Sequence, residues 1–175
     1  MSPHRDTNRA SDGASGRGQD TDYEAVKRLL GRDPQGSFEI VLRRDDGSPV
    51  VLANGPLLDG GRPMPTRYWL ADRQLVKAIG QLESGGGVKA AESEVDPAAL
   101  QAAHDAYAAA RDQLIDATHH GPRPSGGVGG TRKGVKCLHA HYANFLMGAD
   151  DPVGDWIQAH LVGRGAAFDP SQPGQ

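Results

Sequence analysis

The sequence lacks the features that define three common classes of protein. It has one cysteine in 175 residues, so no disulfide can form within the chain. No apolar run approaches the roughly 18 residues of a membrane-spanning helix, and the N-terminus lacks the apolar segment of a secretory signal. The net charge of -3 gives no general reason to expect nucleic acid as a partner. We therefore expect a cytoplasmic protein without a membrane span.

Large apolar residues are also scarce at the two ends of the chain. Residues 1–20 contain no Leu, Ile, Val, Phe, Tyr or Trp, and such a segment cannot bury enough surface to offset the entropy lost on ordering. Phe168 is the only large apolar residue of residues 163–175. We therefore expect disordered tails over residues 1–21 and 163–175, and a single domain over residues 22–162.

The expected domain alternates between helical and strand patterns. Helices are predicted over about 23–31, 73–83, 97–118 and 135–147, and strands over 38–42, 49–52, 67–70 and, more weakly, 88–91. A turn at Asp45-Asp46-Gly47 predicts that the first two strands form a hairpin. The fold class is therefore α+β, with a small, mainly antiparallel sheet of three to four strands and about five helices.

Two polar residues interrupt the apolar stripe of the helix predicted over 97–118. His104 and Arg111 lie on the same stripe as Leu100 and Tyr107. Each has an ordinary explanation alone, since a core histidine can be hydrogen-bonded and an arginine can bury its stem while its head reaches water. Because buried charges need partners, the two together indicate a functional site about as strongly as they indicate packing.

A glycine-rich loop, residues 125–134, precedes the last predicted helix, which we expect to begin at about Val135. Backbone N–H groups at a helix start carry partial positive charge, and nearby arginine and lysine side chains add to it. The loop does not match a Walker motif, because Gly134 is followed by Val135 and Lys136. We predict a phosphate-type anion site here, although a flexible linker remains an alternative. The predicted anion-binding residues are Gly129, Gly130, Arg132, Lys133, Gly134, Lys136 and Arg111.

The string CLHAH places the only cysteine and two histidines within five positions. On a continuous helix Cys137 and His141 share one line, whereas His139 points nearly the opposite way. Cys137 and His141 can bind zinc if a third ligand joins them, and His104 is the best donor. A thiol near a helix start can also act as a nucleophile. Packing as a small buried hydrophobe is the commonest role of such a cysteine, so we expect no bound metal.

Four strings carry a resemblance to a known family: GVKCLHAHYA, PTRYWL, QLESGGGV and DDPVG. With them, residues 32–161 resemble the bacterial, mainly actinobacterial, domain-of-unknown-function family 501. The resemblance implies a cytosolic α+β domain and supplies no established activity, cofactor or catalytic residue. Genes of the family commonly lie near those for enolase, a septum-formation initiator and an exopolyphosphatase, which suggests cell-division or envelope proteins as partners.

Three functions follow as hypotheses. The first is a binding or regulatory domain that holds a small phosphate-containing ligand at the glycine-rich loop. The second is a metal-dependent hydrolase or transferase that uses Cys137 and His141, with His104 or His139 as a further ligand. The third is an adaptor of cell-division or envelope proteins.

Overall fold

The computed structural model describes residues 13–169, with side chains from residue 21 onward, and the chain forms two units, Met1–Pro34 and Gln35–Gln175. In the first unit, helix α1 (Gly13–Leu30) begins ten residues before the expected start at Tyr23. Part of the expected tail is therefore helical, and residues 1–12 lie outside the described part. The helix belongs to a different unit from the sheet.

The second unit contains the expected antiparallel sheet. Its strands are β1 (Phe38–Arg43), β2 (Pro49–Asn54) and β3 (Tyr68–Leu70), in the order β1-β2-β3. The first two strands form the predicted hairpin, where Asp46 accepts a hydrogen bond from the amide of Ser48 and Gly47 takes a positive φ of 82°. Leu52 of β2 lies opposite Ile40 on one side and Trp69 on the other.

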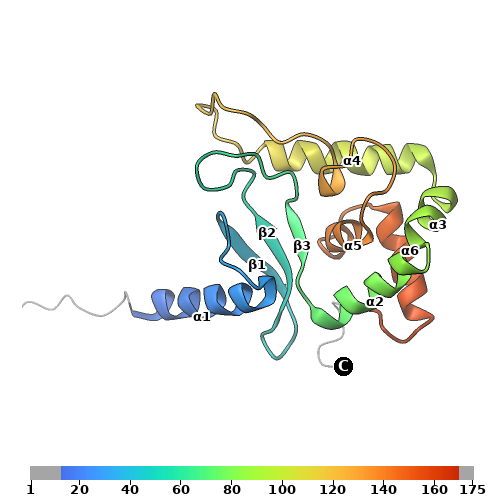
Figure 1. Cartoon of the computed structure of the whole chain (residues 1–175), viewed down its shortest axis with the longest axis horizontal. Helices are drawn as coiled ribbons and strands as arrows, with labels where there is room; N and C mark the ends of the chain where they lie inside the picture. The colour runs from blue at the N-terminus through green and yellow to red at the C-terminus, as the bar shows by residue number, and fades with distance from the viewer. Residues whose placement is uncertain (1–12, 170–175) are drawn as a thin grey trace, which may run out of the picture. The chain divides into compact units, whose positions relative to one another are not determined.

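Five helices complete the second unit: α2 (Arg73–Ser84), α3 (Gly87–Glu94), α4 (Pro97–Asp112), α5 (Leu138–Leu146) and α6 (Pro152–Val162). Aspartates cap three of them, because the carboxylates of Asp72, Asp96 and Asp151 accept the first free amides of α2, α4 and α6. These helices lie on the side of the sheet where β3 is (Figure 1).

In this unit one expected strand and two expected helix boundaries are wrong. Residues 88–91 belong to α3 rather than to a strand, since Ala and Glu favour a helix once Gly86 has turned the chain with a φ of 88°. Helix α4 ends at Asp112 rather than 118, and the carboxylate of Asp116 instead accepts the amide of Thr118 in a local turn. Helix α5 begins at Leu138 rather than Val135.

The main core lies between the sheet and these helices. Its fully buried side chains include Val51 of β2, Ile79 of α2, Tyr142 of α5 and Ile157 of α6. Phe168 packs against this core, and its amide donates to the Tyr142 hydroxyl at 3.4 Å. The segment 163–169, expected to be part of a tail, therefore contacts the folded unit, while residues 170–175 lie outside the described part. Within residues 13–169, no helix combines the length and apolarity needed to cross a membrane.

Candidate functional site

The glycine-rich loop is folded by its own hydrogen bonds. The amide of Gly127 donates to Thr131 O at 2.8 Å, and the amide of Gly130 donates to Gly127 O at 2.9 Å. The amide of Val128 donates to the side chain of His104, so several of the N–H groups expected to hold an anion already have acceptors. A Cβ at Gly127 would overlap the side chain and backbone of His104, which shows that the loop packs closely on α4 and is not a flexible linker.

Arg111 of α4 holds this loop in place through hydrogen bonds to its backbone. Its side chain is 1% exposed and donates to the carbonyls of Gly126 at 2.8 Å and Pro65 at 3.3 Å. It also pairs with Asp112 at 2.8 Å. Of the explanations open for Arg111, a head that reaches water does not apply, because the whole side chain is buried. The guanidinium satisfies loop carbonyls, which accounts for an arginine in the apolar stripe of α4.

The other predicted anion-binding residues do not lie together, and Gly130 packs against the ring of Pro65. Arg132 and Lys133 are exposed. Gly129 and Lys136 line a cavity of about 320 Å³ beside β3. Gly134 lies against Glu92, where a Cβ would overlap the carboxylate. The structure thus brings Gly129 and the exposed Lys136 to the edge of a cavity, and leaves Arg132 and Lys133 outside it.

His104 of α4 and His141 of α5 meet as predicted, with ring centroids 5.5 Å apart. Nδ1 of His104 accepts the amide of Val128, and its Nε2 donates to Gly134 O at 3.0 Å. Burial lowers the pKa of His104, so the ring is held in its neutral form. Because both ring nitrogens are engaged, His104 offers no free atom to a metal.

His141 is fixed by a buried carboxylate. Its Nδ1 lies 2.9 Å from Oδ1 of Asp151, which is 0% exposed. Asp151 also accepts from Asn144 at 3.0 Å and from the first amides of α6. Burial acts to raise the pKa of Asp151, but the hydrogen bond and charge of His141, together with hydrogen bonds from Asn144 and the Gly154 amide, outweigh it and lower that pKa. Within the described chain Nε2 of His141 is buried and has no hydrogen-bond partner.

Cys137 lies in a different cluster, so the predicted zinc ligands Cys137, His141 and His104 do not come together. Cys137 precedes the first turn of α5 in an extended conformation (φ -149°, ψ 117°), and the helical spacing that paired it with His141 does not apply. Its Sγ instead lies 3.8 Å from Nδ1 of His139. That nitrogen is also 3.2 Å from Oε1 of Glu83, at the end of α2. Among the described residues, Glu83, Cys137 and His139 are the group whose ligand atoms all lie within 4.8 Å of one another.

The hydrogen bond made by Nε2 sets the orientation of the His139 ring. Nε2 donates to Val76 O at 3.0 Å, so Nδ1 faces the carboxylate of Glu83 and the thiol of Cys137. A nitrogen lone pair and a carboxylate oxygen at 3.2 Å repel each other unless a proton or a cation lies between them. Burial acts to lower the pKa of His139, but the Cys137 and Val76 hydrogen bonds and the Glu83 charge raise it to about 9.

Glu83 also determines where α5 begins. Its Oε1 accepts the amide of Leu138 at 2.7 Å, which caps the helix with a charge favourable to its dipole. The cluster is half-buried, with side-chain exposures of 28% for Glu83 and 23% for His139. Cys137, for which packing as a small buried hydrophobe was the commonest role, is partly buried and packs against a small apolar cluster that includes Ala140. Cys137 and His139 line the 320 Å³ cavity together with Lys136.

Sequence reasoning missed Glu83 as a member of the site. It lies in α2, and 55 residues separate it from the amide that it caps. The one signal in the sequence was that Glu83 belongs to the QLESGGGV string, one of the four that carry the family resemblance. That string does not indicate which residues Glu83 contacts.

The fold and the cluster define a compact α+β unit with a thiol, an imidazole and a carboxylate grouped at the edge of a cavity. A family model described as "Protein of unknown function (DUF501)" matches residues 40–159. The chain belongs to this family, as the sequence motifs predicted. The matched region includes Glu83, Cys137 and His139. No curated protein and no solved structure matches the chain.

Proposed function

We propose that Glu83, Cys137 and His139 bind a zinc-type cation, and that the protein is a metal-dependent hydrolase or transferase for a small anionic, phosphate-type substrate. The observation that carries the proposal is the convergence of three different ligand atoms within 4.8 Å. A thiolate selects zinc and other soft cations over magnesium or calcium. Three protein ligands leave one coordination position free, which is the pattern of catalytic rather than structural zinc.

The distances in the cluster support tetrahedral coordination. With zinc–ligand bonds of about 2.3 Å to sulfur, 2.1 Å to nitrogen and 2.0 Å to oxygen, a tetrahedral angle separates S from N by about 3.6 Å and N from O by about 3.3 Å. The corresponding distances are 3.8 Å between Cys137 and His139 and 3.2 Å between His139 and Glu83. The hydrogen bond from His139 to Val76 O is the outer contact that commonly orients a metal-binding histidine.

The same geometry disfavours a thiol nucleophile. In a Cys–His–carboxylate relay, the thiol and the carboxylate contact opposite nitrogens of the imidazole. Here Cys137 and Glu83 both face Nδ1 of His139, and Nε2 is bound to a backbone carbonyl. A proton on Nδ1 can hold only one of them well, whereas a cation binds all three groups at once.

The cavity beside the cluster provides a place for the substrate. Lys136 lines it and supplies a positive charge, and Tyr68 and Trp69 of β3 form another part of its wall. A bound zinc lowers the pKa of its water to about 7 and polarises a phosphoryl or carbonyl oxygen. The proposal retains the phosphate-type ligand predicted from the sequence but assigns it to the cavity. The loop amides are a poorer site because several of them already have acceptors.

A competitive zinc titration against a coloured chelator tests the metal site. We expect the wild type to bind one equivalent and His139→Gln to bind at least about a hundredfold more weakly, since loss of an outer-shell contact alone costs 10- to 100-fold. His120→Gln, at an exposed histidine, is the control and should bind as the wild type does. Wild-type protein that takes up no zinc, or a His139→Gln variant that binds it equally, would show that the cluster only caps α5.

A pair of lysine variants tests the part of the proposal that concerns anion binding. Inorganic phosphate should bind the zinc-loaded protein, and Lys136→Met should weaken that binding roughly tenfold because a charge-assisted contact is lost. Lys133→Met, the control, removes an equal charge three residues away at a position that does not line the cavity. Equal phosphate affinities in the two variants would contradict the assignment of Lys136 to the site.

A further inference from the structure

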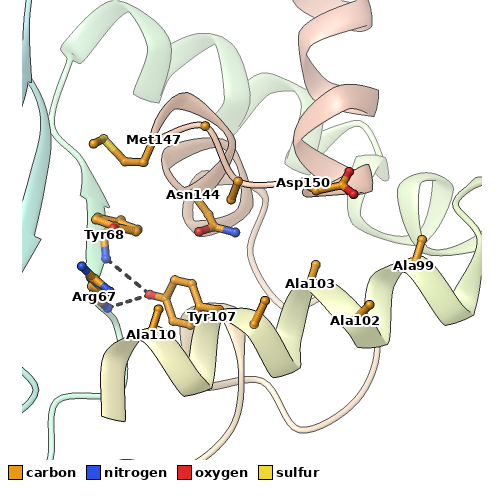
Figure 2. Close-up of a pocket in the computed structure, with 13 residues that line it drawn as sticks. Arg67, Tyr68, Ala99, Ala102, Ala103, Tyr107, Ala110, Asn144, Met147 and Asp150 are labelled. Carbon is orange, nitrogen blue, oxygen red and sulfur yellow. Dashed lines mark hydrogen bonds between the residues drawn. The ribbon is translucent and has the colours of Figure 1, made fainter. Parts of the chain in front are cut away.

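A second cavity, of about 420 Å³, lies along α4 and has no part in the proposed metal site. Figure 2 shows the alanine side chains of α4 along one wall, with Ala102 and Ala110 among them. Asn144 and Met147 from the end of α5 lie across from them, and Arg67 lies at one end. Short side chains on a helix face produce a trough with an apolar wall, but they do not by themselves indicate a ligand.

Polar groups at the β3 end of the cavity supply an independent indication. Tyr107 is 4% exposed, and its hydroxyl oxygen accepts the amides of Arg67 at 2.6 Å and Tyr68 at 3.3 Å (Figure 2). Its own hydrogen has no acceptor among residues 13–169. Burial raises the pKa of Tyr107, so the hydroxyl keeps that hydrogen.

Arg67, which is partly buried, adds a positive charge at the same end of the cavity. Its Nε is buried and has no hydrogen-bond partner in the described part of the chain. The guanidinium carbon lies 4.9 Å from the centre of the Tyr68 ring, which holds the positive charge beside the cavity. The guanidinium charge of Arg67 and the hydroxyl hydrogen of Tyr107 lie at one end of the cavity, and together they favour a ligand that brings an acidic group.

The far end of the cavity carries the opposite charge. Asp150, in the segment between α5 and α6, lines it beyond Asn144, above the part of α4 that holds Ala99 and Ala102 (Figure 2). The rise of 1.5 Å per helical residue puts Ala99 and Ala102 roughly 8–12 Å from Tyr107 along α4. The cavity is therefore cationic at one end, apolar along α4 and anionic at the other end.

We propose that this cavity binds a small linear zwitterion. Its acidic head contacts Arg67 and Tyr107, its aliphatic body lies on the alanines of α4, and its amine lies near Asp150. The charges at the two ends set the orientation of the ligand, and the distance between them selects its length.

Calorimetric titration with three probes tests the proposal: 8-aminooctanoate, octanoate and octylamine. The wild type should bind 8-aminooctanoate most tightly and octylamine most weakly. Arg67→Met should weaken both acids roughly tenfold, because a hydrogen bond to a charged group is lost. Asp150→Asn should reduce the affinity for 8-aminooctanoate to that for octanoate and leave octanoate unchanged.

A matched pair on α4 tests the place of binding without touching a charge. Ala106→Leu fills the cavity and should abolish binding of 8-aminooctanoate, whereas Ala109→Leu, at an exposed position of the same helix outside the cavity, should leave it intact. Both changes keep a good helix former, so folding is preserved. A chelator should not alter binding, which separates this site from the metal site. The proposal fails if wild-type protein shows no saturable binding, or if Ala106→Leu binds as the wild type does.

Discussion

His139 and His141 lie two positions apart on α5, and each contacts a carboxylate, yet their surroundings differ. The His141 side chain is 1% exposed and its partner Asp151 is 0% exposed, whereas the side chains of His139 and Glu83 are 23% and 28% exposed. The buried pair joins α5 to the cap of α6, and the half-buried pair faces a thiol and a cavity. A histidine and a carboxylate thus join structural elements where the core encloses them, whereas the same pair at the edge of a cavity is accessible to a ligand.

The largest expected difference between the pairs is in stability. Asp151→Ala should lower the free energy of unfolding by about 3–5 kcal/mol, because it leaves buried His141 and Asn144 without their acceptor. Glu83→Ala should cost only about 1–2 kcal/mol, since a helix cap and a partly exposed ion pair are lost. Urea unfolding of the zinc-free proteins measures both values. Equal losses would remove the distinction between a structural and an available pair.

The second test concerns the loop that packs on the buried histidines. Gly127→Ala should lower the free energy of unfolding by about 1–3 kcal/mol, because its Cβ would overlap His104 and one of the two segments must move. Gly80→Ala is the control, since it lies within α2 with open space around its Cβ. That change should stabilise the protein by up to about 1 kcal/mol, as glycine is unfavourable in a helix. If both variants are equally stable, the loop does not pack on α4 as described.

A smaller effect should appear in the pH dependence of stability. Burial lowers the pKa of His104 below its ordinary 6.5, so the unfolded chain binds a proton there more readily than the folded one. The contribution of His104 is therefore present above pH 6.5 and is lost as the pH falls below that value. His104→Gln keeps a donor and an acceptor for Gly134 O and the Val128 amide but does not titrate. The variant should lose less stability than the wild type between pH 7 and pH 5 in urea unfolding, and identical profiles would contradict this.

Local signals in the sequence were sufficient for much of the fold. Alternating apolar residues and the Asp45–Gly47 turn predicted the hairpin, and Asp96 before Pro97 predicted the start of α4. Polar residues beside the apolar faces of the two helices predicted that His104 or Arg111 approaches Cys137 or His141, and His104 does approach His141. Residues 88–91 were misassigned because a short segment with one Val and two Ala carries little periodic information, and the turn at Gly86 decides its conformation.

The candidate site was harder to predict because distant side chains determine it. Glu92 accepts the amide of Val135, and Glu83 accepts that of Leu138, across 43 and 55 positions. These contacts delay the start of α5 and leave Cys137 in an extended conformation. A prediction based on helical spacing therefore paired Cys137 with the wrong histidine. No local pattern contains this information, since the two carboxylates come from α2 and α3.

The central claim is that Cys137 and His139, rather than His141, bind a metal, and cobalt(II) substitution tests it directly. A thiolate bound to cobalt(II) gives an intense charge-transfer absorption in the near ultraviolet, and tetrahedral coordination gives strong visible bands. We predict both signals in the wild type and in His141→Gln, loss of the near-ultraviolet band in Cys137→Ser, and loss of tetrahedral binding in His139→Gln. A wild-type spectrum like that of aqueous cobalt, or an unchanged charge-transfer band in Cys137→Ser, would contradict the account.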